Sequence, residues 1–396
     1  MNSIFKHILT AVALLATLCL TACSETDAEQ DQGKMPYVQY VRKCNPEISD
    51  SLIVKSSLGQ RIAFIGSNLG DVQQVWFNDQ KAKLNPTLIT SNAIIVDVPT
   101  TIPEEVTNTV RFITSTGLEY SYPFEVEVPK PVVNNVSCLY AHPGDVITLE
   151  GDYFIGKEGE VYVTFPGGAV AKPQANDFSK TSIKVTVPDG ATEEGYLSVT
   201  SMYGTSRTNF KFLETDGLLF NLDDGYTQPW GKGDTGTENG ISGRYVWLHT
   251  ASNGAWNWSD ALMYGYWPSV NKPVAEGDLD KLALRFEVDS REWSDVPMLI
   301  WFDTFGEKIN PDDNLAQCHW KPWLKNGEKV NYQTNGWVTV TIPLTDFKYN
   351  KEESVNNLSI GDISQYTNLN IMLFGAADGT SPVDIRMDNF RIVSID

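Results

Sequence analysis

Residues 336–347 read GWVTVTIPLTDF, and this stretch decides the fold class of the last part of the chain. The β-branched residues Val338, Val340 and Ile342 alternate with threonines. Because successive side chains on a strand point to opposite faces of the sheet, this period of two predicts a half-buried β-strand. Its apolar face belongs to a core, and its threonine face points outward.

Similar alternation occurs in LALRFEV (282–288), MLIWFDTF (298–305), NLNIMLFGA (368–376) and DIRMDNFRIVSI (384–395). In MLIWFDTF the parity assigns Phe302 to the inner face and Trp301 to the opposite face. The apolar parity of the last stretch changes near Asp388 and Asn389, which predicts a β-bulge. No segment longer than a turn has a convincing helical pattern. We therefore predict an all-β jelly-roll sandwich over residues 215–396.

Two similar stretches precede this domain, at residues 36–128 and 129–214. Each contains short alternating strands between Gly and Asn turns, and Gly66 in the first corresponds to Gly151 in the second. The repetition predicts a tandem pair of small β-sandwiches. Trp76, in the strand VWFND of the first repeat, is predicted to lie in its core.

The chain opens MNSIFKHILTAVALLATLCLTAC, with a basic start followed by an apolar run. This layout is typical of a secretory signal, and the run is too short to span a bilayer comfortably. Its end, LTAC, resembles the bacterial lipobox. We therefore expect residues 1–22 to be a lipoprotein signal peptide and Cys23 to carry the lipid. An ordinary signal peptide with an accidental cysteine is the alternative.

Residues 23–35 are acidic and poor in apolar side chains, so we expect a disordered tether. An acidic stretch directly after a lipidated cysteine resembles the surface-export signal of Bacteroidetes lipoproteins, which implies an outer-membrane, cell-surface location. The formal net charge of the whole chain is −20 at pH 7. Such a surface repels phosphate backbones, and this argues against nucleic acid as a partner.

The aromatic residues are concentrated in the last domain, which holds every one of the 11 tryptophans except Trp76. The stretch NGAWNWSDALMYGYWPSV (253–270) places large rings among Gly, Asn and Ser, as in a surface loop. HWKPW (319–323) offers two more rings in what we predict to be a polar, lysine-rich loop. The candidate ligand-binding aromatics are Trp256, Trp258, Tyr264, Tyr266, Trp267, Trp301, Trp320 and Trp323.

Four motifs carry a family resemblance. The motifs GSNLGDV and VWFND of the first repeat resemble the immunoglobulin-like IPT/TIG family, and the second repeat resembles it more loosely. GWVTVTIPLTDF and the exit DGTSPVDIRMDNFRI resemble β-jelly-roll carbohydrate-binding modules. Together with the lipobox, the whole chain resembles a Bacteroidetes surface glycan-binding protein whose C-terminal domain is similar to the xyloglucan-binding domain family.

This resemblance implies a polysaccharide ligand, a β-glucan or a hemicellulose such as xyloglucan or mixed-linkage glucan. It also implies a TonB-dependent transporter and an associated glycan-binding lipoprotein as partners. An aromatic ring matches the flat C–H face of a pyranose, which gives the candidate aromatics a physical role. Two IPT-like spacers would carry this binding domain, and no catalysis is expected.

Other functions remain open at this point. A protein-binding adhesin would also use clustered aromatic rings. A glycoside hydrolase would need two facing carboxyl groups across a cleft, and no hydrolase motif is apparent. Jelly-roll modules often hold a structural calcium ion, for which Asp223 or Asp224 with Asp388 could supply oxygen ligands. A solvated acidic turn is the simpler interpretation of these residues, and no cofactor is expected.

Overall fold

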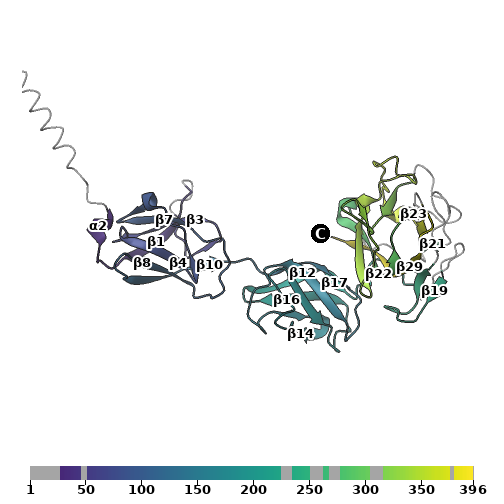
Figure 1. Cartoon of the computed structure of the whole chain (residues 1–396), viewed down its shortest axis with the longest axis horizontal. Helices are drawn as coiled ribbons and strands as arrows, with labels where there is room; N and C mark the ends of the chain where they lie inside the picture. The colour runs from purple at the N-terminus through teal and green to yellow at the C-terminus, as the bar shows by residue number, and fades with distance from the viewer. Residues whose placement is uncertain are drawn as a thin grey trace, which may run out of the picture. The chain divides into compact units, whose positions relative to one another are not determined.

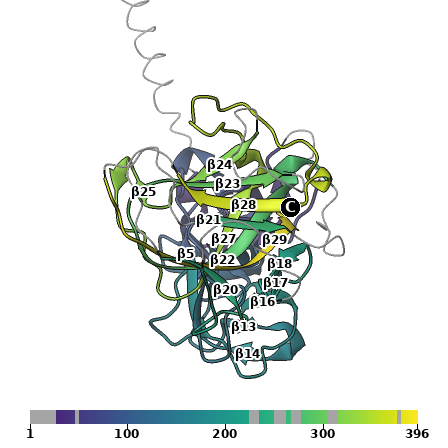
Figure 2. The same cartoon turned by 90° about the vertical axis from the view of Figure 1, so that its right-hand side faces the viewer.

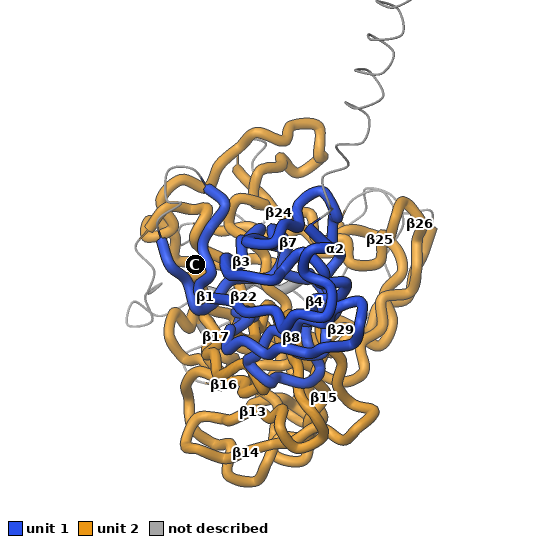
Figure 3. Tube along the Cα trace, turned by 90° about the vertical axis from the view of Figure 1, so that its left-hand side faces the viewer, with its two compact units in different colours: residues 1–129 blue, residues 130–396 orange. Residues whose placement is uncertain are grey.

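The computed structural model describes residues 27–45, 51–223, 234–249, 262–266, 277–303, 315–374 and 379–395, with the backbone alone for 262–266. The described chain is built of β-strands with short helical turns, so the predicted all-β class is confirmed (Figure 1). It divides into two compact units, Met1–Pro129 and Lys130–Asp396 (Figure 3). Among the described residues, no helix has the length and apolar character of a membrane span.

The N-terminal unit is a sandwich of two four-stranded sheets with an aromatic core around Phe64, Phe77 and Phe112. One sheet has the order β1 (Tyr37–Lys43), β3 (Arg61–Ser67), β7 (Ala93–Asp97) and β6 (Ile89–Thr90). The other has the order β5 (Gln80–Lys81), β4 (Val72–Phe77), β8 (Thr109–Thr114) and β9 (Glu119–Pro123). β2 (Lys55–Ser57) pairs with β10 (Glu125–Glu127), and η2 (Pro86–Leu88) precedes β6.

The second unit begins with a smaller sandwich, here called the middle sandwich. One of its sheets has the order β11 (Val132–Val136), β12 (Val146–Asp152) and β15 (Ser182–Thr186). The other has the order β14 (Val170–Ala171), β13 (Tyr162–Thr164), β16 (Gly195–Ser201) and β17 (Gly204–Phe212), with η3 (Pro166–Gly168) after β13.

The two repeats share one backbone device, which confirms their predicted correspondence. The pairing register of β1 with β3 shifts after Val38, and that of β11 with β12 shifts after Val133. Opposite each shift lies a glycine, Gly66 or Gly151. A Cβ atom there would lie 1.9 Å from the Tyr37 carbonyl oxygen or 1.8 Å from that of Val132. Only glycine permits so close a backbone approach at both positions.

The rest of the second unit is the C-terminal sandwich. Its larger sheet has the order β19 (Asp234–Gly236), β20 (Tyr245–Leu248), β29 (Val383–Ser394), β22 (Leu282–Trp293) and β27 (Val338–Pro343), and β18 (Leu218–Phe220) also pairs with β29. The smaller sheet has the order β21 (Leu262–Tyr266), β28 (Asn368–Leu373), β23 (Met298–Asp303) and β24 (Gln317–Trp320). The remaining elements are the hairpin β25 (Leu324–Lys325) with β26 (Glu328–Lys329) and the turns η4 (Leu279–Lys281), η5 (Leu344–Asp346) and η6 (Ile363–Gln365).

The main core of the C-terminal sandwich lies between these two sheets, and the alternation predicts it well. Phe286, Ile300 and Ile342 all belong to this core. The bulge predicted in β29 is also present, because the register shifts where Asn389 adopts a positive φ of 53°. The shift lets residues on both sides of the bulge face the same core.

The predicted disorder of residues 23–35 is wrong for its second half. Residues Asp27–Asp31 form the short helix α2, and Asp31 is only 3% exposed. Its carboxylate accepts a hydrogen bond from the Gly70 backbone N–H at 3.0 Å. A Cβ atom on Gly70 would lie 2.4 Å from the Asp27 carbonyl oxygen, so the helix lies directly on this glycine. A specific buried hydrogen bond therefore holds in place a segment that its composition predicts to be disordered.

The predicted core position of Trp76 is also wrong. Val75 and Phe77 take the inward positions of β4, and alternation therefore places Trp76 on the outer face, where it is half-buried. The cations of Lys81 and Arg111, on the flanking strands, lie 5.8 and 5.7 Å from its ring centroid. Cation–π contacts and aliphatic stems cover the ring in place of a core.

Candidate functional site

The smaller sheet of the C-terminal sandwich has a second face, turned away from the main core. On β23 the residues Met298, Ile300 and Phe302 enter the main core, whereas Leu299 and Trp301 do not. The parity predicted for this strand is therefore confirmed. The opposite face is the candidate site, and we call it the second face.

A straight row of residues crosses the second face from strand to strand. Trp301 of β23 pairs with Asn370 of β28 on one side and with Gln317 of β24 on the other. Directly paired residues on antiparallel strands project from the same face of the sheet. On the far side of β28, the backbone of Tyr264 in β21 pairs with Asn370. Figure 2 shows the four strands side by side.

Four buried polar atoms of this row have no hydrogen-bond partner among the described residues, whereas Gln317 Nε2 donates to the Leu315 carbonyl oxygen at 3.4 Å. Asn370, Trp301 and Gln317 are each 0% exposed. Within the described chain, neither amide atom of Asn370, nor Trp301 Nε1, nor Gln317 Oε1 makes a hydrogen bond. Most buried polar groups in proteins are paired, and an unmade bond costs about 1–3 kcal/mol for each group. Unmet donors and acceptors on three adjacent residues therefore indicate a place built to bind something polar.

Apolar side chains flank this polar row. Trp301 packs with Leu299, Met372 and Phe374 in a buried cluster that is separate from the main core. The Lys351 ammonium lies 4.4 Å from the ring centroid of Phe374. An aromatic and aliphatic surface beside amide donors and acceptors suits a ligand that is apolar on one face and hydroxylated at its edges.

A histidine borders the second face at β24. His319 pairs with Leu299, and its side chain is only 4% exposed. Its Nε2 lies 2.9 Å from the Asn350 carbonyl oxygen. Burial lowers the pKa of His319, although the Glu353 carboxylate partly opposes this effect. A neutral imidazole at neutral pH therefore borders the row and adds no fixed charge to it.

The predicted binding aromatics fall into three groups. Trp301 lies in the row, and it is enclosed in this structure. The backbones of Tyr264 and Tyr266 lie in β21, paired with Asn370 and Asn368 of β28. The second group, Trp256, Trp258 and Trp267, lies outside the described residues, as does the predicted lipidation site Cys23.

The third group is Trp320 and Trp323: Trp323 belongs to the main core, and the partly buried Trp320 packs against that core. Trp320 ends strand β24, so the loop predicted for it is wrong, and its ring centroid lies 5.2 Å from that of Trp293. Trp323 is 4% exposed, and its indole N–H donates to the Val296 carbonyl oxygen at 3.2 Å. Their rings fill the sandwich interior, and we therefore leave them out of the binding set proposed below.

Sequence analysis missed Gln317 and Asn370. Asn370 alternates with Leu369 and Ile371 in a strand, where asparagine is unfavourable, and this was the available signal. Gln317 gave no comparable signal, because only the register of β24 with β23 brings it beside Trp301.

Of the acidic residues considered for calcium, Asp388 lies at the bulge of β29. Asp388 accepts a hydrogen bond from the Ser242 hydroxyl at 2.9 Å, and Asp223 accepts one from the Arg244 backbone N–H at 2.9 Å. Asp224 lies outside the described residues. Across the described ranges, no group of three or more His, Cys, Asp or Glu side chains is arranged to hold a metal ion. Burial instead raises the pKa of Asp388 to about 8.

This raised pKa predicts a pH-dependent stability. Because the folded-state pKa of Asp388 exceeds its ordinary value of 3.8, its contribution is most favourable below about pH 4 and is lost as the pH rises through 8. We expect Asp388→Asn, which mimics the neutral acid, to stabilise the protein by about 1–4 kcal/mol at pH 7.5 and hardly at pH 4. Thermal unfolding at both pH values, with EDTA present, measures this. An equal effect at both values would contradict the prediction.

The sequence of this chain is similar to a known protein family and to a known relative. Residues 212–394 match the family described as surface glycan-binding protein B xyloglucan binding domain. An IPT/TIG domain-containing protein of Bacteroides ovatus is 28% identical over 228 residues, which cover 53% of this chain and 46% of that protein. The chain thus spans less than half the length of this curated relative.

Two solved structures are similar over nearly the whole chain. The surface glycan-binding protein B of Prevotella bryantii is 25% identical with a TM-score of 0.79, covering 91% of this chain and 99% of that one. A surface glycan-binding protein B from a complex xyloglucan utilization locus in Bacteroides uniformis, at 18% identity and a TM-score of 0.51 over the same shares, shows the same fold. These matches confirm the resemblance on which the sequence analysis relied.

Proposed function

We propose that this chain binds a β-glucan or hemicellulose polysaccharide at the second face, because residues 212–394 match a family of surface glycan-binding domains. The observation that carries the proposal is the row of Asn370, Trp301 and Gln317. It offers unmet donors and acceptors beside an aromatic ring. Sugar hydroxyls satisfy such atoms, and the C–H faces of a pyranose pack against rings.

The expected affinity is modest. Burying half of one aromatic side chain against a sugar contributes roughly 2–3 kcal/mol before costs. The row is fully buried in this structure, so a sugar reaches it only by replacing the contacts that enclose it. After this cost and that of ordering the polymer, roughly −4 to −8 kcal/mol remains, which is micromolar to millimolar binding. Weak binding suits a protein that passes its polymer to another.

Binding without hydrolysis is the function that the relatives support, because they are glycan-binding proteins. An adhesin would present apolar surface to its partner, and the unmet amide atoms favour a hydroxylated ligand instead. The proposal therefore ranks glycan capture above both alternatives.

The proposed cellular role follows from the first residues of the chain and from the family. A lipid on Cys23 would anchor the protein in the outer membrane at the cell surface. Polysaccharide held at the second face would then pass to a TonB-dependent transporter together with an associated glycan-binding lipoprotein. Labelling with a radioactive fatty acid, lost in Cys23→Ala, tests the anchor separately from binding.

Isothermal titration of residues 24–396 tests the binding proposal. The ligands are soluble xyloglucan, mixed-linkage β-glucan, β-1,3-glucan and galactomannan. We expect heat with at least one of them, and we expect Trp301→Phe, which removes the indole N–H, to weaken that binding. Trp323→Phe is the matched control, because it makes the same change in the main core and should leave affinity unchanged. No heat with any polymer, or equal affinities for the two variants, would overturn the proposal.

A further inference from the structure

The hydrophobic core of the middle sandwich contains a residue from the C-terminal sandwich. Ile241, in the segment between β19 and β20, is 2% exposed and belongs to the core cluster of the middle sandwich. Trp337, just before β27, is half-buried and packs against the same cluster. Its indole N–H donates to the Asn239 carbonyl oxygen at 2.9 Å, which joins the two segments. Two separate domains joined by a linker do not share a core in this way.

The same contact encloses charged residues on the outer face of the larger sheet. Arg285, Glu287 and Arg391 occupy positions that alternate with core residues, yet they are 5%, 0% and 0% exposed. Arg391 binds Glu287 through two N–H···O bonds of 2.8 and 2.9 Å. The Arg391 guanidinium also lies 4.9 Å from the ring centroid of Tyr140, a residue of the middle sandwich. The middle sandwich therefore takes the place of solvent over this face.

Hydrogen bonds fix the contact from both sides. The Thr339 backbone N–H donates to the Ser137 carbonyl oxygen at 2.8 Å, and its hydroxyl accepts the Leu139 N–H at 2.8 Å. The same hydroxyl donates to Glu287 at 2.9 Å. The Tyr140 hydroxyl donates to the carbonyl oxygen of Glu214, which lies in the segment that joins the two sandwiches. One threonine thus links a backbone segment of the middle sandwich to the buried ion pair.

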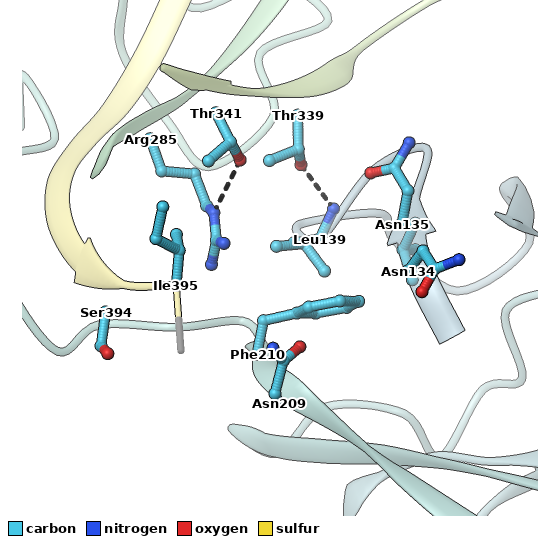
Figure 4. Close-up of a pocket in the computed structure, with 11 residues that line it drawn as sticks. Asn134, Asn135, Leu139, Asn209, Phe210, Arg285, Thr339, Thr341, Ser394 and Ile395 are labelled. Carbon is cyan, nitrogen blue, oxygen red and sulfur yellow. Dashed lines mark hydrogen bonds between the residues drawn. The ribbon is translucent and has the colours of Figure 1, made fainter. Parts of the chain in front are cut away.

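Figure 4 shows where this contact opens into a cavity of about 270 Å³. Phe210 of the middle sandwich and Arg285 of the C-terminal sandwich both line it. Arg285 donates to the Thr341 hydroxyl at 3.0 Å and to the Glu214 carboxylate at 2.9 Å, so its guanidinium is held in place beside the cavity. Even where packing is incomplete, bonds therefore hold the two sandwiches together.

We infer that the middle sandwich is not an independent spacer but one half of a single folding unit, so that residues 130–396 fold and open cooperatively. Separating the sandwiches would expose Ile241 and Trp337 to water and leave the Leu139 N–H without its partner. It would also uncover the Arg391–Glu287 pair. Each of these costs opposes independent opening of either half. The inference concerns folding, and it stands whether or not the second face binds glycan.

Native-state hydrogen exchange of the whole chain tests whether a substitution in either sandwich loosens both of them. Thr339→Val, in the C-terminal sandwich, should speed exchange by at least about threefold in β12 of the middle sandwich as well as in β22. Tyr140→Phe, in the middle sandwich, should do the same in both strands. Thr90→Val is the matched control, because it removes a hydroxyl that accepts the Ala93 N–H in the N-terminal unit and should leave both strands unchanged.

The exchange pattern distinguishes one cooperative folding unit from two independent ones. Faster exchange in both strands with either variant supports a single cooperative unit. Faster exchange confined to the sandwich that carries the substitution, or in neither sandwich, overturns the inference. The readout uses no glycan, so failure of the proposed binding function would not produce either pattern.

Discussion

Asn370→Leu is expected to make the protein at least as stable as the wild type while weakening glycan binding more than about tenfold. Both amide atoms of Asn370 are buried without a hydrogen-bond partner in the described chain, so the folded protein bears their desolvation cost. Leucine has the same number of side-chain heavy atoms with the same branching and carries no such cost. The substitution also removes the amide donor and acceptor that we propose form hydrogen bonds with sugar hydroxyls.

The matched control for this prediction is Asn350→Leu. Asn350 is also buried, at 6% exposed, but its amide donates to the Ser354 hydroxyl at 2.8 Å and accepts the Val355 N–H at 3.0 Å. Leucine there leaves a backbone N–H unpaired and should lower stability by about 1–3 kcal/mol. Thermal unfolding and titration with the bound polymer measure both variants. Equal destabilisation by the two, or unchanged binding by Asn370→Leu, would refute the assignment of this row.

The contrast between these asparagines marks what the sequence could and could not predict. Alternation in β23 and β27 predicted the inner face correctly, because burial on one face imposes a period of two wherever a strand lies. Parity also placed Trp301 opposite the main core. Which residues meet Trp301 depends on the register between strands far apart in sequence, and no local pattern encodes that register.

Aromatic residues were harder to assign than strands. Trp320 and Trp323 lie in the polar stretch HWKPW, which suggested an exposed loop, yet Trp323 lies in the main core and Trp320 packs against it. Aromatic side chains are large enough to reach a core from the end of a strand, so the polarity of sequence neighbours says little about them. The prediction for Trp76 was wrong in the opposite sense. Its residue type suggested a core position, whereas its place in the alternation of β4 puts it on the outer face.

Charged residues at alternate positions of β22 show what strand parity leaves undetermined. Arg285 and Glu287 matched the outward parity, and the natural expectation for such residues is solvent. The parity was right, but the outer face of the sheet is covered by the middle sandwich. A sequence pattern distinguishes the two faces of a sheet without revealing what covers the second one.

Arg391→Met is therefore expected to cost about 3–5 kcal/mol of unfolding free energy. The substitution leaves the Glu287 carboxylate, at 0% exposed, without its two guanidinium bonds in a place water does not reach. The single charge left behind dominates the cost. Of the side chains that the structure describes, only that of Thr339 would still donate a hydrogen bond to this carboxylate.

The double variant Arg391→Met, Glu287→Leu should recover much of this loss, because no unpaired charge remains and two apolar side chains occupy the space. Denaturant unfolding of the whole chain, monitored in the second unit, gives the free energies for the cycle. A single variant as stable as the wild type would mean that water reaches Glu287. A double variant no better than the single would mean that Arg391 acts mainly through its contact with Tyr140, so that the ring contact and not the ion pair stabilises the module.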